Sequence, residues 1–110
     1  MEEKIYDILN ELGVPFNLSG RDYIVRAVSL IYENGRMAMT KEVYPQIAAE
    51  FETGKTGVER CIRHAVEKAF RNGNTNAITK YFGLNIDFNT GKLTNSDFIY
   101  GLVEYLRRNR

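Results

Sequence analysis

Basic residues recur between positions 55 and 72 at a spacing that could read DNA. This segment holds five Lys and Arg against two Glu, a local charge of +3. At about 100° per residue, three of its charged residues share the outward side of the N-terminal half of a helix. Arginine can present two donors to guanine O6 and N7, and glutamate can accept from cytosine N4. We therefore predict base contacts from Glu59, Arg60 and Arg63.

The other polar residues of this segment are placed to hold a DNA backbone. Phosphate contacts fix the register of a protein on the duplex without reading its sequence. His64 is the only histidine, and no acid or nucleophile beside it suggests catalysis. We predict phosphate contacts from Lys55, Thr56, His64, Lys68 and Arg71.

The same residues also fit a helix that simply faces solvent. Glu59 and Arg63 have the i,i+4 spacing of a surface ion pair. Thr56 and Glu59 have the spacing of a capping box, in which the carboxylate bonds to the backbone at the helix start. Composition alone does not decide between a solvated surface and a DNA-binding surface.

The neighbouring elements favour DNA because they predict a helix-turn-helix. A helix is expected from Pro45 to about Glu52, and a second, at about 56–72, follows a short stretch with two glycines. Two helices joined by such a turn form this motif. The apolar residues of the second helix share one side, which packs it on the rest of the domain: Val58, Cys61, Ile62, Ala65, Val66 and Ala69.

The rest of the chain also has helical spacing. Gly13 and Gly83 end two predicted helices, and Ser19 with Asp22, like Thr94 with Asp97, has capping-box spacing. The segment 84–93 is expected to be an extended loop, with a minor hairpin as the alternative. The chain is thus predicted to be one all-α domain, 1–110, of about six helices. Besides the two helices of the motif, they cover 5–12, 19–34, a short stretch from near Thr40 to Tyr44 before Pro45, 76–82, and a closing segment from Thr94 that ends in Arg107, Arg108 and Arg110.

Composition excludes several classes of function. The chain has 110 residues, 44% of them hydrophobic, and a net charge of +1. This length and hydrophobic fraction indicate one globular domain, and the low net charge excludes a uniformly basic surface. One cysteine and one histidine allow no intramolecular disulfide, no cysteine-rich zinc cluster and no His-based metal site. No signal peptide or membrane span is recognisable, so we expect a cytoplasmic protein without cofactor. An enzyme is disfavoured, because capping and loop solvation explain Asp87 and Asp97 near Tyr100.

The string V-E-R-C-I-R-H-A at 58–65, after Y-P-Q-I-A at 44–48, resembles the C-terminal effector domain of the sporulation master regulator family, stage 0 sporulation protein A. Further similarity lies at 71–74, 82–83 and 94–99, and it covers the chain from about Ile8 to Leu106. The resemblance implies a six-helix transcription factor domain of spore-forming bacteria that binds DNA, often as two copies on adjacent sites. The family's base-contacting positions fall here on Glu59, Arg60 and Arg63. It also implies contact with the RNA polymerase sigma subunit through Ile78 and Phe82.

The sequence departs from the family pattern in three ways. Gly57 stands where family members have an arginine that contacts DNA, although Lys55 could partly compensate. Lys80 and Tyr81 do not match the polymerase-contacting pattern. No receiver domain is present in these residues, so the chain is either an excised domain or a small regulator. These departures motivate an alternative function, a protein-interaction module or antagonist that acts on sporulation regulation or on RNA polymerase and binds DNA weakly.

Overall fold

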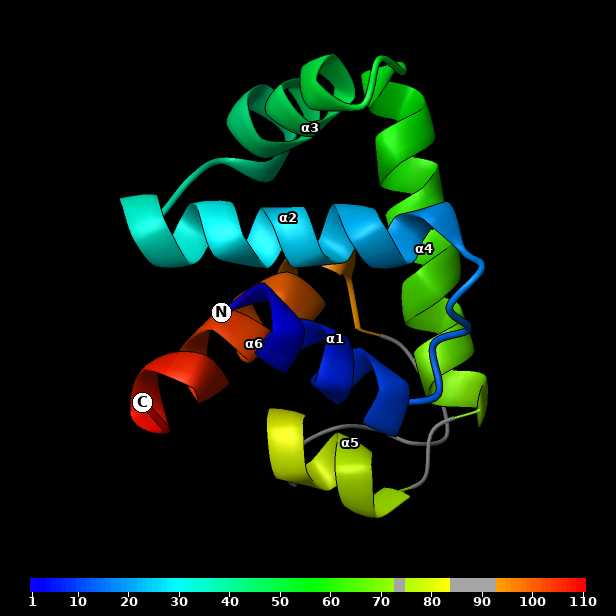
Figure 1. Ribbon diagram of the computed structural model, residues 1–110, viewed down its shortest axis with the longest axis vertical. Coiled ribbons are helices and arrows are strands. Elements are labelled where there is room, and N and C mark those ends of the chain that lie inside the picture. Colours follow the sequence, from blue (N-terminus) through cyan, green and yellow to red (C-terminus); the bar gives the residue numbers. More distant parts are fainter. Residues whose placement is uncertain (73–74, 84–92) are drawn as a thin grey trace.

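Helices make up all the regular secondary structure in the part of the chain that the structure describes. The computed structural model describes residues 1–72, 75–83 and 93–110 (Figure 1). This confirms the predicted all-α fold. In chain order the elements are α1 (Glu2–Glu11), α2 (Ser19–Asn34), a π-helical turn η1 (Met39–Val43), α3 (Tyr44–Glu50), α4 (Lys55–Asn72), α5 (Thr75–Phe82) and α6 (Asn95–Arg108).

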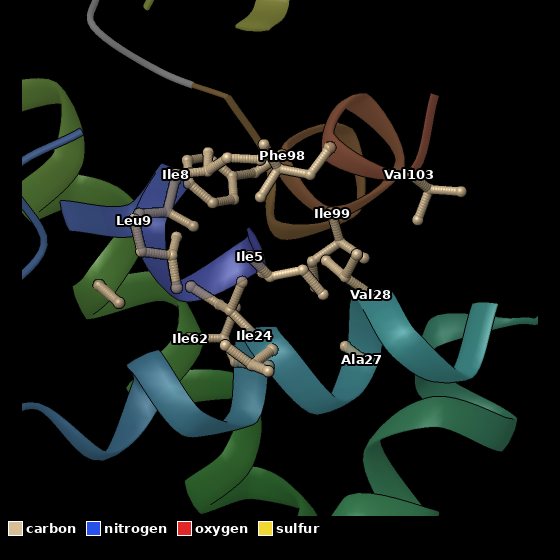
Figure 2. Packing of buried hydrophobic residues seen from close by; sticks show 14 of the residues in the cluster. Ile5, Ile8, Leu9, Ile24, Ala27, Val28, Ile62, Phe98, Ile99 and Val103 are labelled. Carbon is tan, nitrogen blue, oxygen red and sulfur yellow. The ribbon is translucent and has the colours of Figure 1, made fainter. Parts of the chain in front are cut away.

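α2 lies at the centre of the fold and packs against α1, α3, α4 and α6. In Figure 1 it runs across the middle of the molecule, with α3 above it and α1 and α6 below. The core draws one apolar stripe from each helix, which is how amphipathic helices bury their hydrophobic faces together. Figure 2 shows this packing, with α1, α2, α4 and α6 supplying Ile5, Ile8, Leu9, Ile24, Ala27, Val28, Ile62, Phe98, Ile99 and Val103.

The predicted helix ends are only partly confirmed. Gly13 and Gly83 follow α1 and α5 with φ of +78° and +90°, the left-handed conformation that suits glycine after a helix. The Thr94 hydroxyl caps α6 by accepting from the Asp97 N–H at 3.0 Å. The capping box at Ser19 is wrong, because Ser19 is already helical and the N-cap is Leu18. Asp22 instead accepts a hydrogen bond from the Tyr6 hydroxyl at 2.6 Å.

Two further predictions concern segments between the helices. The short helix expected before Pro45 is the turn η1, which runs directly into α3, where proline occupies the first turn. The loop or hairpin predicted at 84–93 lies outside the described residues, apart from Leu93. Among the helices described, none is both long and apolar enough to cross a membrane.

Candidate nucleic-acid interface

The turn between α3 and α4 consists of residues 51–54 and is closed by backbone hydrogen bonds. The Thr53 N–H donates to the Ala48 carbonyl at 2.9 Å, and the Glu52 N–H donates to Ala49 at 3.4 Å. This is the bonding pattern of a Schellman motif, which ends a helix with one left-handed residue. That residue is Glu52, at φ of +54°, and not one of the two glycines emphasised by the sequence. This tight turn leaves only four residues between the end of α3 and the start of α4.

α4 begins earlier than the sequence predicted. The Val58 N–H donates to the Gly54 carbonyl at 3.1 Å, so the helical ladder starts at Gly54 and the helix at Lys55. The prediction that this helix starts at about Thr56, with Thr56 in a capping box, is therefore wrong. Because Thr56 lies inside the first turn, Glu59 is not occupied by a capping box.

A close crossing with α2 fixes the position of α4. A Cβ atom built on Gly20 would lie 2.1 Å from the Cys61 carbonyl oxygen and 3.1 Å from the Ala65 Cβ. Real Cβ atoms do not approach a backbone oxygen so closely, so only glycine permits this helix separation. The first turn of α2 thereby holds the middle of α4 (Figure 1).

α3 is held on α2 by an ion pair and an aromatic contact. Arg26 donates to both carboxylate oxygens of Glu50, at 2.6 and 3.1 Å. This guanidinium lowers the pKa of the Glu50 carboxyl, and Gln46 adds a further hydrogen bond. In the turn, the Phe51 ring meets Tyr23 edge-on, with centroids 5.0 Å apart. Both elements of the helix-turn-helix are thus supported from α2.

The predicted apolar face of α4 is the buried one. Val58, Ile62, Ala65, Val66 and Ala69 are at most 3% exposed. Cys61 is half-buried rather than fully buried, because it lies at the edge of this face, where its carbonyl meets Gly20. The opposite face of α4 carries the residues of this helix that are exposed in the described part of the chain.

The outward side of α4 carries the predicted DNA-contacting residues. Among the predicted base contacts, Arg60 is exposed and makes no ion pair within the described residues, and Arg63 is also exposed. Among the predicted phosphate contacts, Lys68 is half-buried at the flank of the helix. The other four are exposed: Lys55, Thr56, His64 and Arg71.

Glu59 and Arg63 form the i,i+4 ion pair that was the alternative explanation for their spacing. Arg63 Nη1 donates to Glu59 Oε1 at 2.7 Å, and their side chains are 35% (Glu59) and 53% (Arg63) exposed. Pairs this exposed contribute about 0–1 kcal/mol to stability. A duplex offering phosphate or guanine acceptors can displace so weak a pair, so it does not remove Arg63 from the interface.

Asn95, at the start of α6, is a site-positioning residue that the sequence reasoning missed. Its Nδ2 donates to the Glu59 carbonyl and to the Tyr44 hydroxyl, each at 3.1 Å. Asn95 thus ties α6 to the beginning of both α3 and α4. Burial raises the pKa of the Tyr44 hydroxyl, opposed by the hydrogen bond from Asn95. The capping motif at Thr94 located the start of α6 but gave no sign that it lies beside α4.

The predicted polymerase-contacting residues lie largely inside the fold. Ile78 is 2% exposed, because the apolar stripe of α5 places it in the core. Phe82 is half-buried, with its ring centroid 4.9 Å from that of Phe98 and 6.4 Å from that of Phe70. The described residues contain no group of three or more His, Cys, Asp or Glu that could hold a metal ion.

These features define a class: a helix-turn-helix domain that presents a basic helix on an all-α scaffold. The family model described as "Sporulation initiation factor Spo0A C terminal" matches residues 5–106. The chain belongs to this family, the DNA-binding effector domain of a sporulation response regulator. This confirms the resemblance seen in the V-E-R string and makes the chain a DNA-binding regulator in general rather than a member of an enzyme family.

Proposed function

We propose that this domain is a sequence-specific transcription regulator that inserts α4 into the major groove of DNA and has no enzymatic activity. Glu59, Arg60 and Arg63 read base edges. Lys55, Thr56, His64, Lys68 and Arg71 hold phosphates. The domain acts in the bacterial cytoplasm, where its DNA target lies.

The observation that carries this proposal is that Arg60, on the exposed face of α4, forms no ion pair within the described residues. Arg60 projects from the middle of the exposed face, and no carboxylate of the described residues pairs with it. A guanidinium that the fold does not use is available for bidentate bonding to guanine. The buried opposite face and the Gly20 crossing keep the helix in one orientation.

Two partners beyond a single duplex follow from the family resemblance and are part of the proposal. A second copy would bind an adjacent site on the same DNA. The sigma subunit of RNA polymerase would meet α5 through the exposed edge of Phe82 and not through Ile78, which is buried.

The proposal is tested by selecting duplexes from a random pool and measuring the binding of variants to the selected sequence. Arg60→Ala should weaken that duplex by about 1–3 kcal/mol and relax the preference at one base pair. Lys68→Ala should weaken all duplexes alike and lower the salt slope by about one. Arg108→Ala, which removes an exposed arginine at the end of α6, is the matched control.

The outcomes separate the two candidate functions. Equal binding by all three variants and the unchanged chain would remove α4 from the groove. If no duplex is retarded at low salt and a sporulation regulator or polymerase is captured instead, the protein-interaction alternative replaces the DNA-binding proposal.

A further inference from the structure

A groove begins beside Glu59 and Arg63 of α4 and leads away from that helix toward Arg36. Its first part is lined by Arg63 and Glu59, by Leu93 and the start of α6, and by Met39, Thr40 and Tyr44. Its second part is lined by residues 36–41, Ser96 and Tyr100. The two parts share Met39, Thr40 and Ser96, so they form one depression between α6 and the segment that enters α3.

The side chains along this groove suit a polyanion. It is lined by three cations, Arg63, Lys41 and Arg36, and by one carboxylate, Glu59, which already pairs with Arg63. Hydroxyl and amide groups lie between the cations: Thr40, Thr94, Asn95 and Ser96.

The two outer cations, Lys41 and Arg36, have no ion-pair partner within the described residues. Lys41 is exposed and, within the described residues, has no ion-pair or hydrogen-bond partner. The neighbouring carboxylate of Glu42 is turned to the backbone, where it accepts from the Ala38 N–H at 2.8 Å. Arg36 is exposed, and its Cζ lies 5.4 Å from the Tyr100 ring centroid.

The walls of the groove are internally braced. The Tyr100 hydroxyl exchanges hydrogen bonds with the backbone of Met37, accepting from its N–H at 3.1 Å and donating to its carbonyl. Asn95 connects the other end to Glu59 and Tyr44. The cations therefore stand on a surface whose shape is set before any partner arrives, which lowers the entropic cost of binding.

The position of the groove beside α4 identifies its occupant. An α-helix is about 10–12 Å across with its side chains, and the major groove is about 12 Å wide. A helix that fills the major groove therefore has a sugar-phosphate backbone on each flank. By helical spacing, Glu59 and Arg63 lie on one flank of α4, and Gly57 and Lys68 lie on the other.

We propose that this groove, which begins beside the base-reading Arg63, holds the sugar-phosphate backbone of one DNA strand, with Lys41 and Arg36 on its phosphates. Lys68 contacts the backbone of the opposite strand. This inference rests on the proposed DNA-binding function and extends the footprint beyond α4 on one side only. The contacts contribute affinity and salt dependence but no base preference, because phosphates carry no sequence information.

The experiment compares Lys41→Gln, Lys68→Gln and Lys4→Gln, which remove one exposed or half-exposed charge each from the groove, from α4 and from α1. Each variant is titrated with the selected duplex over a range of salt. Lys41→Gln and Lys68→Gln should each lower the salt slope by about 0.9, and Lys4→Gln should leave it unchanged. Arg36→Gln should act like Lys41→Gln. Circular dichroism melting checks that every variant is folded.

Duplexes with neutral methylphosphonate linkages then assign the strands. Neutralising phosphates on one strand should abolish the effect of Lys41→Gln but not that of Lys68→Gln, and neutralising the other strand should do the reverse. Unchanged binding by both groove variants, while Arg60→Ala and Lys68→Gln still weaken it, would overturn the groove assignment and keep the proposed function. No binding of any duplex by the unchanged domain would overturn both.

Discussion

α2 and α4 both carry arginines, but they use them differently. In α2, Arg21 is 8% exposed and donates to Asn10 and the Val14 carbonyl, and Arg26 pairs with Glu50. In α4, Arg60 and Arg71 are exposed and have no such partners among the described residues. Arg21 and Arg26 hold the scaffold together, whereas Arg60 and Arg71 of α4, unlike the paired Arg63, form no such bonds within the described residues.

The difference arises from the position of each helix, not from its composition. α2 is surrounded by other helices, so its cations meet carbonyls and carboxylates of the chain itself. α4 lies at one edge of the molecule, with one face against α2 and the other in solvent (Figure 1). A cation on α4 therefore stays exposed where the described residues supply no acceptor for it.

The largest effect should follow from Gly20→Ala, which tests whether α2 positions α4. The new Cβ would lie 2.1 Å from the Cys61 carbonyl oxygen, so the two helices must separate. We expect a loss of about 3 kcal/mol or more in the free energy of unfolding, measured by urea denaturation. An unchanged midpoint would show that α4 is not fixed at this crossing.

The second prediction compares the removal of an arginine from α2 with the removal of an arginine from α4. Arg21→Met should lower the free energy of unfolding by about 1–3 kcal/mol, because Asn10 and Val14 lose a buried donor. Arg60→Met should change stability by less than about 0.5 kcal/mol and weaken DNA binding instead. Thermal melts and duplex titrations of both variants test this directly. Similar losses of stability in the two would contradict the distinction between scaffold and contact arginines.

Gly57 offers a smaller change within α4 itself. Among the described residues, a Cβ there meets only the Thr53 Oγ1, at 3.6 Å, so a side chain fits. Gly57→Ala should raise the free energy of unfolding by about 0.5–1 kcal/mol, because glycine is unfavourable inside a helix. Gly57→Arg, the residue type of the resembling family, should in addition tighten duplex binding. A loss of stability in Gly57→Ala would mean that the helix start needs glycine.

The smallest expected effect concerns the ion pair between α2 and α3. Arg26 lowers the folded-state pKa of Glu50 below its ordinary value. The resulting stability is present above the ordinary carboxyl pKa and is lost as the pH falls through the lower, folded-state value. Because the pair is about a third exposed, we expect less than about 1 kcal/mol. Glu50→Gln should flatten the acid side of the melting-temperature profile, and an identical profile would contradict the assignment.

The sequence predicted the helices well because their apolar residues recur at helical spacing. It also placed Val58, Ile62 and Ala65 on the buried face of α4, which follows from periodicity alone. It misplaced the start of α4, because Thr56 and Glu59 fit a capping box that a ladder starting at Gly54 leaves unused.

The contacts between distant segments could not be predicted from local pattern. Asn95 is 36 residues from Glu59, and nothing near either residue signals their hydrogen bond. In the sequence, Gly20 is simply the glycine next to the predicted cap Ser19, and nothing there indicates that it permits the close crossing with Cys61. Ile78 was assigned to a partner by resemblance, but the register of α5 buries it.

The crossing at Gly20 has a practical consequence for engineering. The α4 atoms nearest to a Cβ on Gly20 are the Cys61 carbonyl group and the Ala65 methyl group, both on the inner side of the helix. Positions 60, 63, 64, 67 and 71 can therefore be randomised together without changing the crossing at Gly20 that positions α4 on α2. A display library built on this domain would yield variants that prefer new DNA sequences while the rest of the scaffold stays the same.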